Sequence, residues 1–316
     1  MTTPTAPAAG VHLPWAQVPE PVQTWAARVG GGVPAHVRDL QGGFSPGAAA
    51  RLECPGRPLF VKAVGAGLNP DSPVMHRREA VVSAALPDSS LFPTLLDTYD
   101  DGDWVALAFE ALDGRPPRHP WERGELASVV DALGALHCAL TPSPAPQLEP
   151  AEVYLRNLFG GWAELAARDE PPGSLDPWAC TNLSRLTELE SAWPAAAAGT
   201  TLVHGDVRSD NILFTADGVV FVDWPHAAIG APVLDVVEWA SSVVLEGGPE
   251  PEELLAAHGP SRDADPEVVT VLLAAVCGFF VAHSLRPPPP GLPTVRAFQA
   301  AQGYVAMSWL RRRTMW

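Results

Sequence analysis

Two neighbouring stretches, Leu202-Val-His-Gly-Asp-Val-Arg-Ser-Asp-Asn-Ile-Leu-Phe214 and Val219-Val-Phe-Val-Asp-Trp224, decide the fold of this chain. Each contains a short apolar run rich in β-prone residues, and Thr215-Ala-Asp-Gly218 lies between the two runs. An Asp-Gly step between two such runs is a strong signal for a β-hairpin. The sequence therefore predicts two antiparallel strands that follow a polar loop.

The predicted hairpin brings three polar side chains together. Asn211 enters the first strand and Asp223 leaves the second, so both lie at one end of the hairpin, on chains about 5 Å apart. Asp206 precedes Asn211 by five residues, the interval between the acid that meets the substrate hydroxyl and the metal-binding amide in kinase catalytic loops. Because Mg²⁺ prefers oxygen ligands, Asn211 and Asp223 are candidate metal ligands. An ordinary surface hairpin with polar turn and cap residues is the alternative.

Lys62 is the only lysine among the 20 basic residues. It lies in Leu59-Phe-Val-Lys-Ala-Val64, a strand-like run similar to the kinase strand whose lysine reaches the α- and β-phosphates. The only glutamate in residues 65–90 is Glu79, in a predicted helix over 74–86. We expect Glu79 to pair with Lys62. The alternatives are a surface lysine and a solvated glutamate.

Together these residues resemble the signature of the aminoglycoside phosphotransferase family of small-molecule kinases, which includes choline, homoserine and macrolide kinases. The matching positions are His204-Gly-Asp206, Asn211, Asp223-Trp224, Gly230 and Asp235. The resemblance implies that Asp206 is the catalytic acid–base residue, that Asn211 and Asp223 bind Mg²⁺, and that Lys62 and Glu79 position the phosphates of ATP, with GTP as the alternative nucleotide. Asp235 would tie the catalytic loop to the following helix.

Protein kinases differ from this pattern. They carry His-Arg-Asp and Asp-Phe-Gly where this chain has His204-Gly-Asp206 and Asp223-Trp-Pro225, and no Ala-Pro-Glu segment is present. A protein kinase is therefore a disfavoured alternative. A pseudokinase that binds without turnover is disfavoured too, because the four residues required for transfer are intact.

The resemblance implies an α+β, protein-kinase-like fold with two lobes. The small N-terminal lobe, residues 1–112, would be an antiparallel sheet with one helix and would bind the nucleotide. The larger, mostly helical lobe, residues 113–316, would hold the catalytic and substrate-binding residues. Strands are expected over 35–40, 48–53, 59–64, 92–99 and 104–112, and later helices over 121–140, 151–169, 181–197, 233–245, 266–285 and 293–313.

Two segments are candidates for nucleotide contacts. Gln41-Gly-Gly-Phe-Ser-Pro-Gly47 lies between two predicted strands, where a phosphate-covering turn belongs, and Ser45 is its candidate contact; a plain flexible turn is the alternative. Phe109-Glu-Ala-Leu-Asp-Gly114 would be the hinge between the lobes. There the backbone groups of Glu110 and Leu112 would pair with adenine.

The charge of the chain limits its partners. A net charge of −16 makes nucleic acid an unsuitable partner. It suits a cationic acceptor such as an aminoglycoside, which an acidic lobe would attract. Arg311-Arg-Arg313 near the C-terminus leaves open a less cationic hydroxylated antibiotic, or a metabolite of the choline, homoserine or sugar type, as the acceptor. We expect a monomer or a homodimer.

The remaining sequence features favour a cytoplasmic enzyme that does not bind membranes. The first ten residues lack the charge and the apolar run of a secretory signal. Residues 268–285 carry no formal charge over 18 positions, which meets the length of a membrane span. Polar residues dilute this segment, and we expect a buried helix of the large lobe. The four cysteines show no metal or disulfide spacing and are expected to be reduced core thiols.

Overall fold

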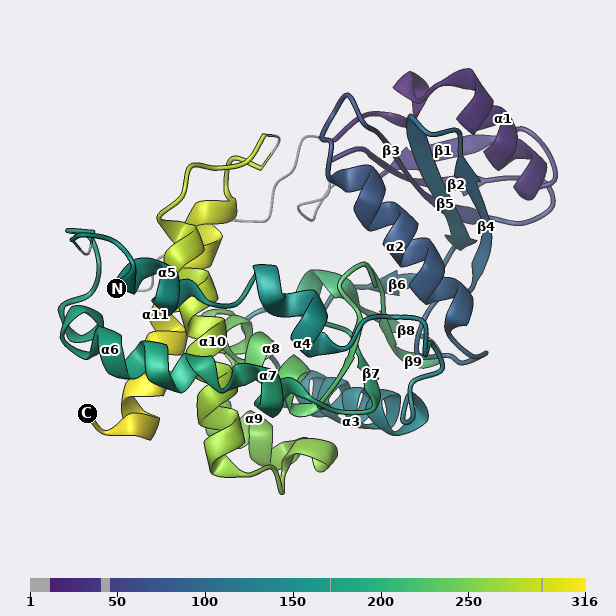
Figure 1. The fold of residues 1–316 in the computed structure, drawn as a ribbon. Coiled ribbons are helices and arrows are strands. Elements are labelled where there is room, and N and C mark those ends of the chain that lie inside the picture. Colours follow the sequence, from purple (N-terminus) through teal and green to yellow (C-terminus); the bar gives the residue numbers. More distant parts are fainter. Residues whose placement is uncertain (1–11, 41–45, 171, 291) are drawn as a thin grey trace.

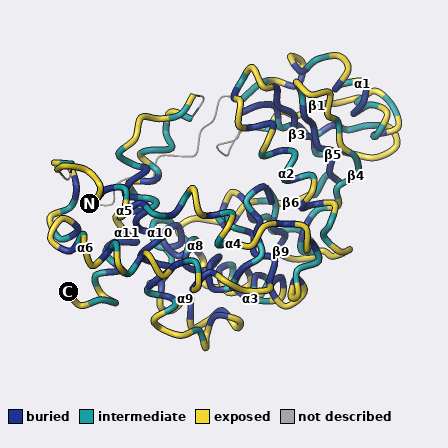
Figure 2. The backbone as a smooth tube through the Cα atoms, in the orientation of Figure 1, coloured by how far each residue is buried: buried dark blue, intermediate teal, exposed yellow. Residues whose placement is uncertain are grey.

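The computed structural model describes residues 12–40, 46–170, 172–290 and 292–316. These residues form a small lobe built on a sheet and a larger lobe built mainly of helices (Figure 1). Buried residues form two hydrophobic cores (Figure 2). One lies in the small lobe, and the larger one lies mainly in the large lobe but also includes Val82 and Phe92. The predicted α+β, protein-kinase-like class is confirmed. The lobe boundary between residues 112 and 113 stays a prediction.

The small lobe contains a five-stranded antiparallel sheet and two helices. The strand order is β1 (His36–Asp39), β2 (Ala48–Glu53), β3 (Leu59–Gly65), β5 (Trp104–Glu110) and β4 (Leu95–Asp100). Helix α2 (Ser72–Ala85) corresponds to the predicted helix. Helix α1 (Glu20–Val29) was not indicated by the sequence pattern; Pro21 lies in its first turn.

Alternation along β3 gives the two faces of the sheet different roles. Leu59, Val61 and Ala63 are fully buried and belong to the core that α1 completes with Trp25. Side chains of successive strand residues point to opposite faces. Lys62 therefore projects from the other face, toward α2. The apolar pattern of one short strand thus sets the direction of the only lysine.

The large lobe is a bundle of helices around one core. The helices are α3 (Arg123–Ala139), α4 (Ala151–Tyr154), α5 (Gly161–Ala166), α6 (Pro177–Ser191), α7 (Trp193–Ala197), α8 (Val233–Leu245), α9 (Pro251–Ala257), α10 (Pro266–Ser284) and α11 (Val295–Thr314). Helix α10 is apolar and long enough to cross a membrane by length and composition, and 67% of its apolar window is buried inside the protein. It packs on α5, α8 and α11, as expected for a core helix.

The single helix predicted over 151–169 is wrong. The structure has two short helices there, α4 and α5, because Gly160 takes a left-handed conformation with φ of +107°. Gly161 then lies against the backbone of α10, where a Cβ atom would come within 2.0 Å of the Gly278 carbonyl oxygen. Close packing between two helices, which the local pattern does not encode, breaks this segment.

The prediction for the cysteines is wrong in part. All four are free. Cys277 is buried in α10 and Cys54 is half-buried, but Cys138 and Cys180 are exposed. The last two lie on the outer faces of α3 and α6, which the scattered spacing could not reveal.

The predicted hairpin is confirmed. Strands β8 (Ile212–Thr215) and β9 (Gly218–Phe221) pair antiparallel, with Ile212 opposite Phe221. Strand β6 (Gly114–Arg115) adds a third strand beside β8. Nearby, β7 (Thr201–Val203) pairs with β10 (Ala228–Gly230). The polar loop between β7 and β8 is thus held at both ends by strands.

Candidate active site

The loop between β7 and β8 makes a tight turn at Gly205. This residue has φ of +73°, and a Cβ atom here would come within 2.5 Å of the His226 carbonyl oxygen. Only glycine fits such a position without strain. The glycine of His204-Gly-Asp206 therefore has a steric role, and it lets the loop approach the segment that follows Asp223.

The carboxylate of Asp235 in α8 holds this loop in place through hydrogen bonds. It accepts hydrogen bonds from the backbone nitrogens of His204 (2.8 Å) and Gly205 (2.7 Å) and contacts Nε2 of His137 at 2.8 Å. Burial alone would raise the pKa of Asp235, but these partners outweigh it and lower the pKa. The helix and the catalytic loop are joined through this carboxylate, as the resemblance implies.

His204 is a fully buried support of the same loop. Its Nε2 lies 3.0 Å from the Val222 carbonyl oxygen, and its Nδ1 lies 3.2 Å from the Asp206 backbone nitrogen. A neutral ring satisfies both contacts by donating from Nε2 and accepting at Nδ1. Burial lowers the pKa of His204, which agrees with this neutral form.

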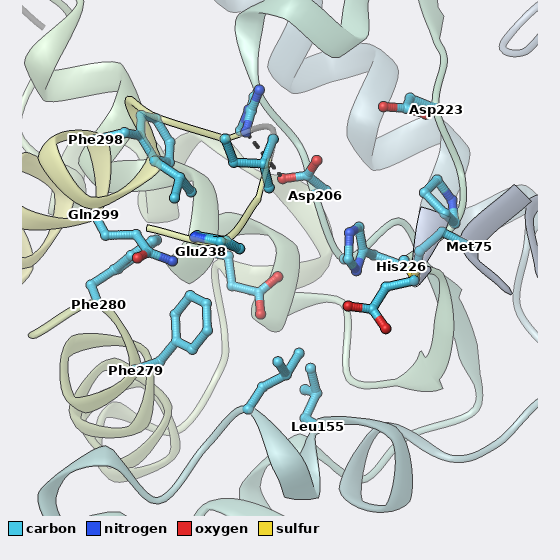
Figure 3. Close-up of a pocket in the computed structure, with 18 of the residues that line it drawn as sticks. Met75, Leu155, Asp206, Asp223, His226, Glu238, Phe279, Phe280, Phe298 and Gln299 are labelled. Carbon is cyan, nitrogen blue, oxygen red and sulfur yellow. Dashed lines mark ion pairs between the residues drawn. The ribbon is translucent and has the colours of Figure 1, made fainter. Parts of the chain in front are cut away.

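Asp206 and Asn211 are in direct contact. The Asn211 side-chain nitrogen donates to the Asp206 carbonyl oxygen at 2.9 Å and to its Oδ2 at 3.0 Å. Arg208 lies 3.9 Å from Oδ1 of Asp206. The Asp206 carboxylate thus has a fixed orientation at the wall of a cavity (Figure 3).

Lys62 bridges the two lobes. Its Nζ lies 2.8 Å from Oε1 of Glu79, the predicted ion pair, and 2.5 Å from Oδ1 of Asp223. Burial by itself lowers the pKa of Lys62, but the two carboxylates outweigh it and raise the pKa above its ordinary value. Burial likewise opposes ionisation of Asp223, yet Lys62 lowers the pKa of this carboxyl to about 2. Both groups are therefore charged at neutral pH.

Asp223 has a strained backbone. Its φ of +69° is in the left-handed region, which few residues other than glycine adopt and where aspartate is tolerated. The Val222 nitrogen donates to the Asn211 carbonyl oxygen at 3.0 Å, which holds the two chains together at this end of the hairpin. Strain of this kind concentrates at functional sites.

Arg78 fastens helix α2 to the large lobe. Its guanidinium stacks on the ring of Tyr154 at 4.0 Å from the ring centroid and donates to the Ala227 carbonyl oxygen at 2.7 Å. Tyr154 in turn contacts His226 Nδ1 through its hydroxyl at 2.9 Å. The helix that carries Glu79 is thus attached to the segment that follows Asp223.

Two of the predicted nucleotide contacts, Glu110 and Leu112, lie at the end of β5 and just beyond it. Glu110 ends β5, where Thr94 donates to its Oε1 at 2.8 Å, and the Leu112 carbonyl oxygen accepts from Arg51 at 3.0 Å. Both stay predictions as adenine contacts. Ser45 lies outside the described residues.

A cavity of about 440 Å³ lies between the lobes and contains the acidic residues of the site (Figure 3). Asp206, Asp223, Met75 and His226 are among the residues that line one side. The opposite side is apolar, with aromatic rings from α10 and α11. Acidic groups on one wall and an apolar opposite wall are typical of a small-molecule binding site.

Sequence reasoning missed two acids of this cavity, Asp71 just before α2 and Glu238 of α8. Glu238 is the one on the wall near Asp206. It stands three residues after Asp235 and four before Ser242, so the three share one face of the helix. Its carboxylate points into the cavity between Asp206 and Leu155 (Figure 3). The available signal was an acid three residues beyond the anchoring aspartate in an otherwise apolar helix.

The three arginines of α11 lie in ion pairs of the large lobe. Arg311 pairs with Asp176, Arg312 with Glu250 at 2.7 Å, and Arg313 with Glu252 at 2.5 Å. None of the three lines the cavity. The positions of these arginines therefore do not support an anionic or neutral acceptor.

A family model described as APH, phosphotransferase enzyme family, matches residues 36–270. Among solved structures, the fold is similar to that of a choline/ethanolamine kinase family protein from Mesorhizobium loti, with 16% identity, a TM-score of 0.59, and 88% of each chain covered. It is also similar to spectinomycin phosphotransferase in complex with ADP and spectinomycin, with 12% identity, a TM-score of 0.54, and 88% of this chain and 89% of that chain covered.

A third similar structure is an aminoglycoside phosphotransferase from Streptomyces rimosus in complex with ADP and streptomycin. It has 18% identity and a TM-score of 0.51, and the match covers 83% of this chain and 99% of that chain. No curated protein sequence matches the chain significantly. At these identities the solved structures establish the fold.

Proposed function

Because the chain belongs to the phosphotransferase enzyme family, we propose that it transfers the γ-phosphate of ATP to a hydroxyl group of a small molecule. The observation that carries this proposal is the contact of Lys62 with both Glu79 and Asp223 beside the cavity that holds Asp206. These groups come from both lobes and meet at one place. GTP is the alternative nucleotide.

In this proposal Asp206 orients the acceptor hydroxyl and takes its proton late in the transfer. Asn211 holds Oδ2 of this carboxylate, and Oδ1, with Arg208 at 3.9 Å, would face the acceptor. A loose phosphoryl transition state needs little help from a base, so positioning supplies most of the rate acceleration. Lys62 would hold the α- and β-phosphates, with Glu79 fixing the direction of its ammonium.

The residues present fit a Mg²⁺ ion. Asn211 directs its amide nitrogen at Asp206, which leaves the amide oxygen available, and Asp223 is ionised at the same end of the hairpin. Carboxylate and amide oxygens are the ligands that Mg²⁺ prefers. Asn211 and Asp223 would hold the ion, and when bound it would offset the negative charge of the phosphate oxygens.

The acceptor class that we propose is an aminoglycoside or another antibiotic, whose phosphorylation would give resistance. The acidic side chains of the cavity support a cationic acceptor, and the similar structures in complex with spectinomycin and with streptomycin support an antibiotic. A metabolite of the choline, homoserine or sugar type is the alternative acceptor. We place the enzyme in the cytoplasm, where ATP is supplied.

The test is ATP turnover against a panel of hydroxylated antibiotics and metabolites, with a generic protein substrate as a comparison. We expect acceptor-dependent ADP release and a phosphorylated small molecule that mass spectrometry identifies. Turnover with the protein substrate would identify a protein kinase. Nucleotide binding without turnover on any acceptor would identify a pseudokinase.

A further inference from the structure

Glu238 is an ionisable side chain for which no described residue supplies a counter-charge. Its Oε2 atom is buried and has no hydrogen-bond partner among the described residues. Burial raises the pKa of Glu238 well above its ordinary value, and Asp235 and Asp206 raise it further. An acid in such a place is costly unless a ligand supplies the missing partner. The chain therefore maintains a group that its own fold leaves unsatisfied, at the wall of its cavity.

The surroundings of Glu238 decide which partner fits. Four acids line the cavity, namely Asp71, Asp206, Asp223 and Glu238, against one arginine, Arg208. Arg208 is already in an ion pair with Asp210. Burial lowers the pKa of His76 to about 4, so that ring is neutral at neutral pH. Lys62 offsets Asp223, and Arg208 also lies near Asp206. Among the described residues no cation pairs with Glu238, so a ligand cation is the complementary group there.

The rest of the cavity lining indicates the size and the apolar character of that ligand. Phe279 and Phe280 of α10 and Phe298 of α11 line the wall beside Glu238 (Figure 3). Aromatic rings supply apolar contact area, and their faces attract cations. A volume of about 440 Å³ is in the lower part of the range for small-molecule sites. The space thus suits one compact molecule.

We propose that Glu238 is the specificity-determining residue of the acceptor site and binds the ammonium group of a compact acceptor that carries one buried amine and an apolar body. This inference rests on the proposed function and narrows it. Glu238 is the one acid among the described lining residues that lies beside the aromatic rings of α10 and α11, and one acid at such a wall suits a monoamine better than an extended polycation. Asp235 fixes the turn of α8 beneath the loop, so the same helix places Glu238 near Asp206. Glu238 of α8 would then bind the amine, and Asp206 of the loop would orient the reacting hydroxyl.

Binding of a matched pair of probes to the full chain, without nucleotide, tests this inference. The probes are 2-phenylethylammonium and its neutral isostere 2-phenylethanol, followed by ligand-observed NMR. Glu238→Gln keeps the shape and removes the charge. Glu253→Gln, on the exposed face of α9, is the matched control. We expect the wild-type protein to prefer the ammonium, and Glu238→Gln to weaken ammonium binding by roughly 10- to 100-fold, as loss of a charged hydrogen bond does.

Glu238→Gln should leave 2-phenylethanol binding unchanged, and Glu253→Gln should change neither probe. Equal binding of the two probes to the wild-type protein would overturn the inference, as would unchanged ammonium binding by Glu238→Gln or no ammonium binding to the wild-type protein. A raised or unchanged melting temperature of Glu238→Gln shows that the variant is folded. Because this assay needs no phosphate transfer, its failure is distinct from a failure of the kinase proposal, which the turnover panel decides.

Discussion

The ammonium of Lys62 lies 2.5 Å from the carboxylate of Asp223, although 161 residues separate them in the chain. One group comes from the sheet of the small lobe and the other from the end of the catalytic hairpin. The contact joins the two lobes at the groups for which we propose phosphate binding and metal binding. In the proposed function, Lys62 would bind the phosphates and Asp223 would bind the metal ion. The position of the pair therefore indicates where the phosphates would lie.

Asp206→Asn should separate catalysis from nucleotide binding. The variant keeps the shape of the side chain and its contact with Asn211, but it cannot accept the proton of the hydroxyl. We expect transfer to fall by about 10²-fold or more, with ATP affinity unchanged by calorimetry. Near-normal turnover on an identified acceptor would show that this loop is only structural.

Asp223→Ala should remove Mg²⁺-dependent nucleotide affinity while the protein stays folded. The substitution deletes one of the two proposed metal ligands. Calorimetric titration with ATP, with and without Mg²⁺, measures the effect. Asp217→Ala, at the exposed turn of the same hairpin, is the control and should bind as the wild type does. If Asp223→Ala still binds Mg²⁺-ATP normally, the metal site lies elsewhere.

Asp235→Ala should destabilise the large lobe. It leaves two backbone N–H groups and His137 without their shared buried acceptor. Removal of one partner from a buried charged network costs about 3–5 kcal/mol. Urea denaturation measures the loss in the free energy of unfolding, with Asp263→Ala, at an exposed position, as the control. A loss below about 1 kcal/mol would show that the loop does not depend on this anchor.

Stability should fall as the pH drops from about 6.5 to about 4, partly because of His76. Burial lowers the pKa of His76 to about 4 in the folded protein, whereas the unfolded chain has the ordinary value near 6.5. Between these values the unfolded state binds the extra proton, so protonation favours unfolding. Denaturation midpoints at pH 7 and pH 5 check this expectation.

His76→Gln should reduce that dependence on pH, and His36→Gln, at an exposed position of β1, should leave it unchanged. The dependence should not vanish, because burial also lowers the pKa of His258 and His283 to about 4. An identical pH dependence in His76→Gln and the wild type would contradict the assignment of a neutral His76.

The parts of the site that sequence predicts are those with local signals. The hairpin is set by one turn between two apolar runs, and the polar ends of that hairpin follow from its geometry. Lys62 and Glu79 were paired by elimination, since the segment offers one lysine and one glutamate. These predictions needed no knowledge of distant packing.

The parts that sequence did not predict depend on long-range contacts. The break between α4 and α5 comes from the approach of Gly161 to Gly278, 117 positions later in the numbering. Glu238 lies at the cavity only because of how α8 packs in the large lobe, and its local sequence pattern does not encode that packing. The three C-terminal arginines suggest a role at the substrate, but their partners are Asp176 just before α6, Glu250 just before α9, and Glu252 in α9.

The attachment of Arg78 to Tyr154 and to the Ala227 carbonyl oxygen has a consequence for control of the enzyme. In protein kinases, movement of the helix that carries the glutamate assembles or dismantles the lysine–glutamate pair, and phosphorylation governs that movement. Here the corresponding helix is tied to the opposite lobe by a stacked guanidinium and a hydrogen bond. The Lys62–Glu79 pair is therefore already assembled in this structure, with the helix that carries Glu79 held against the large lobe.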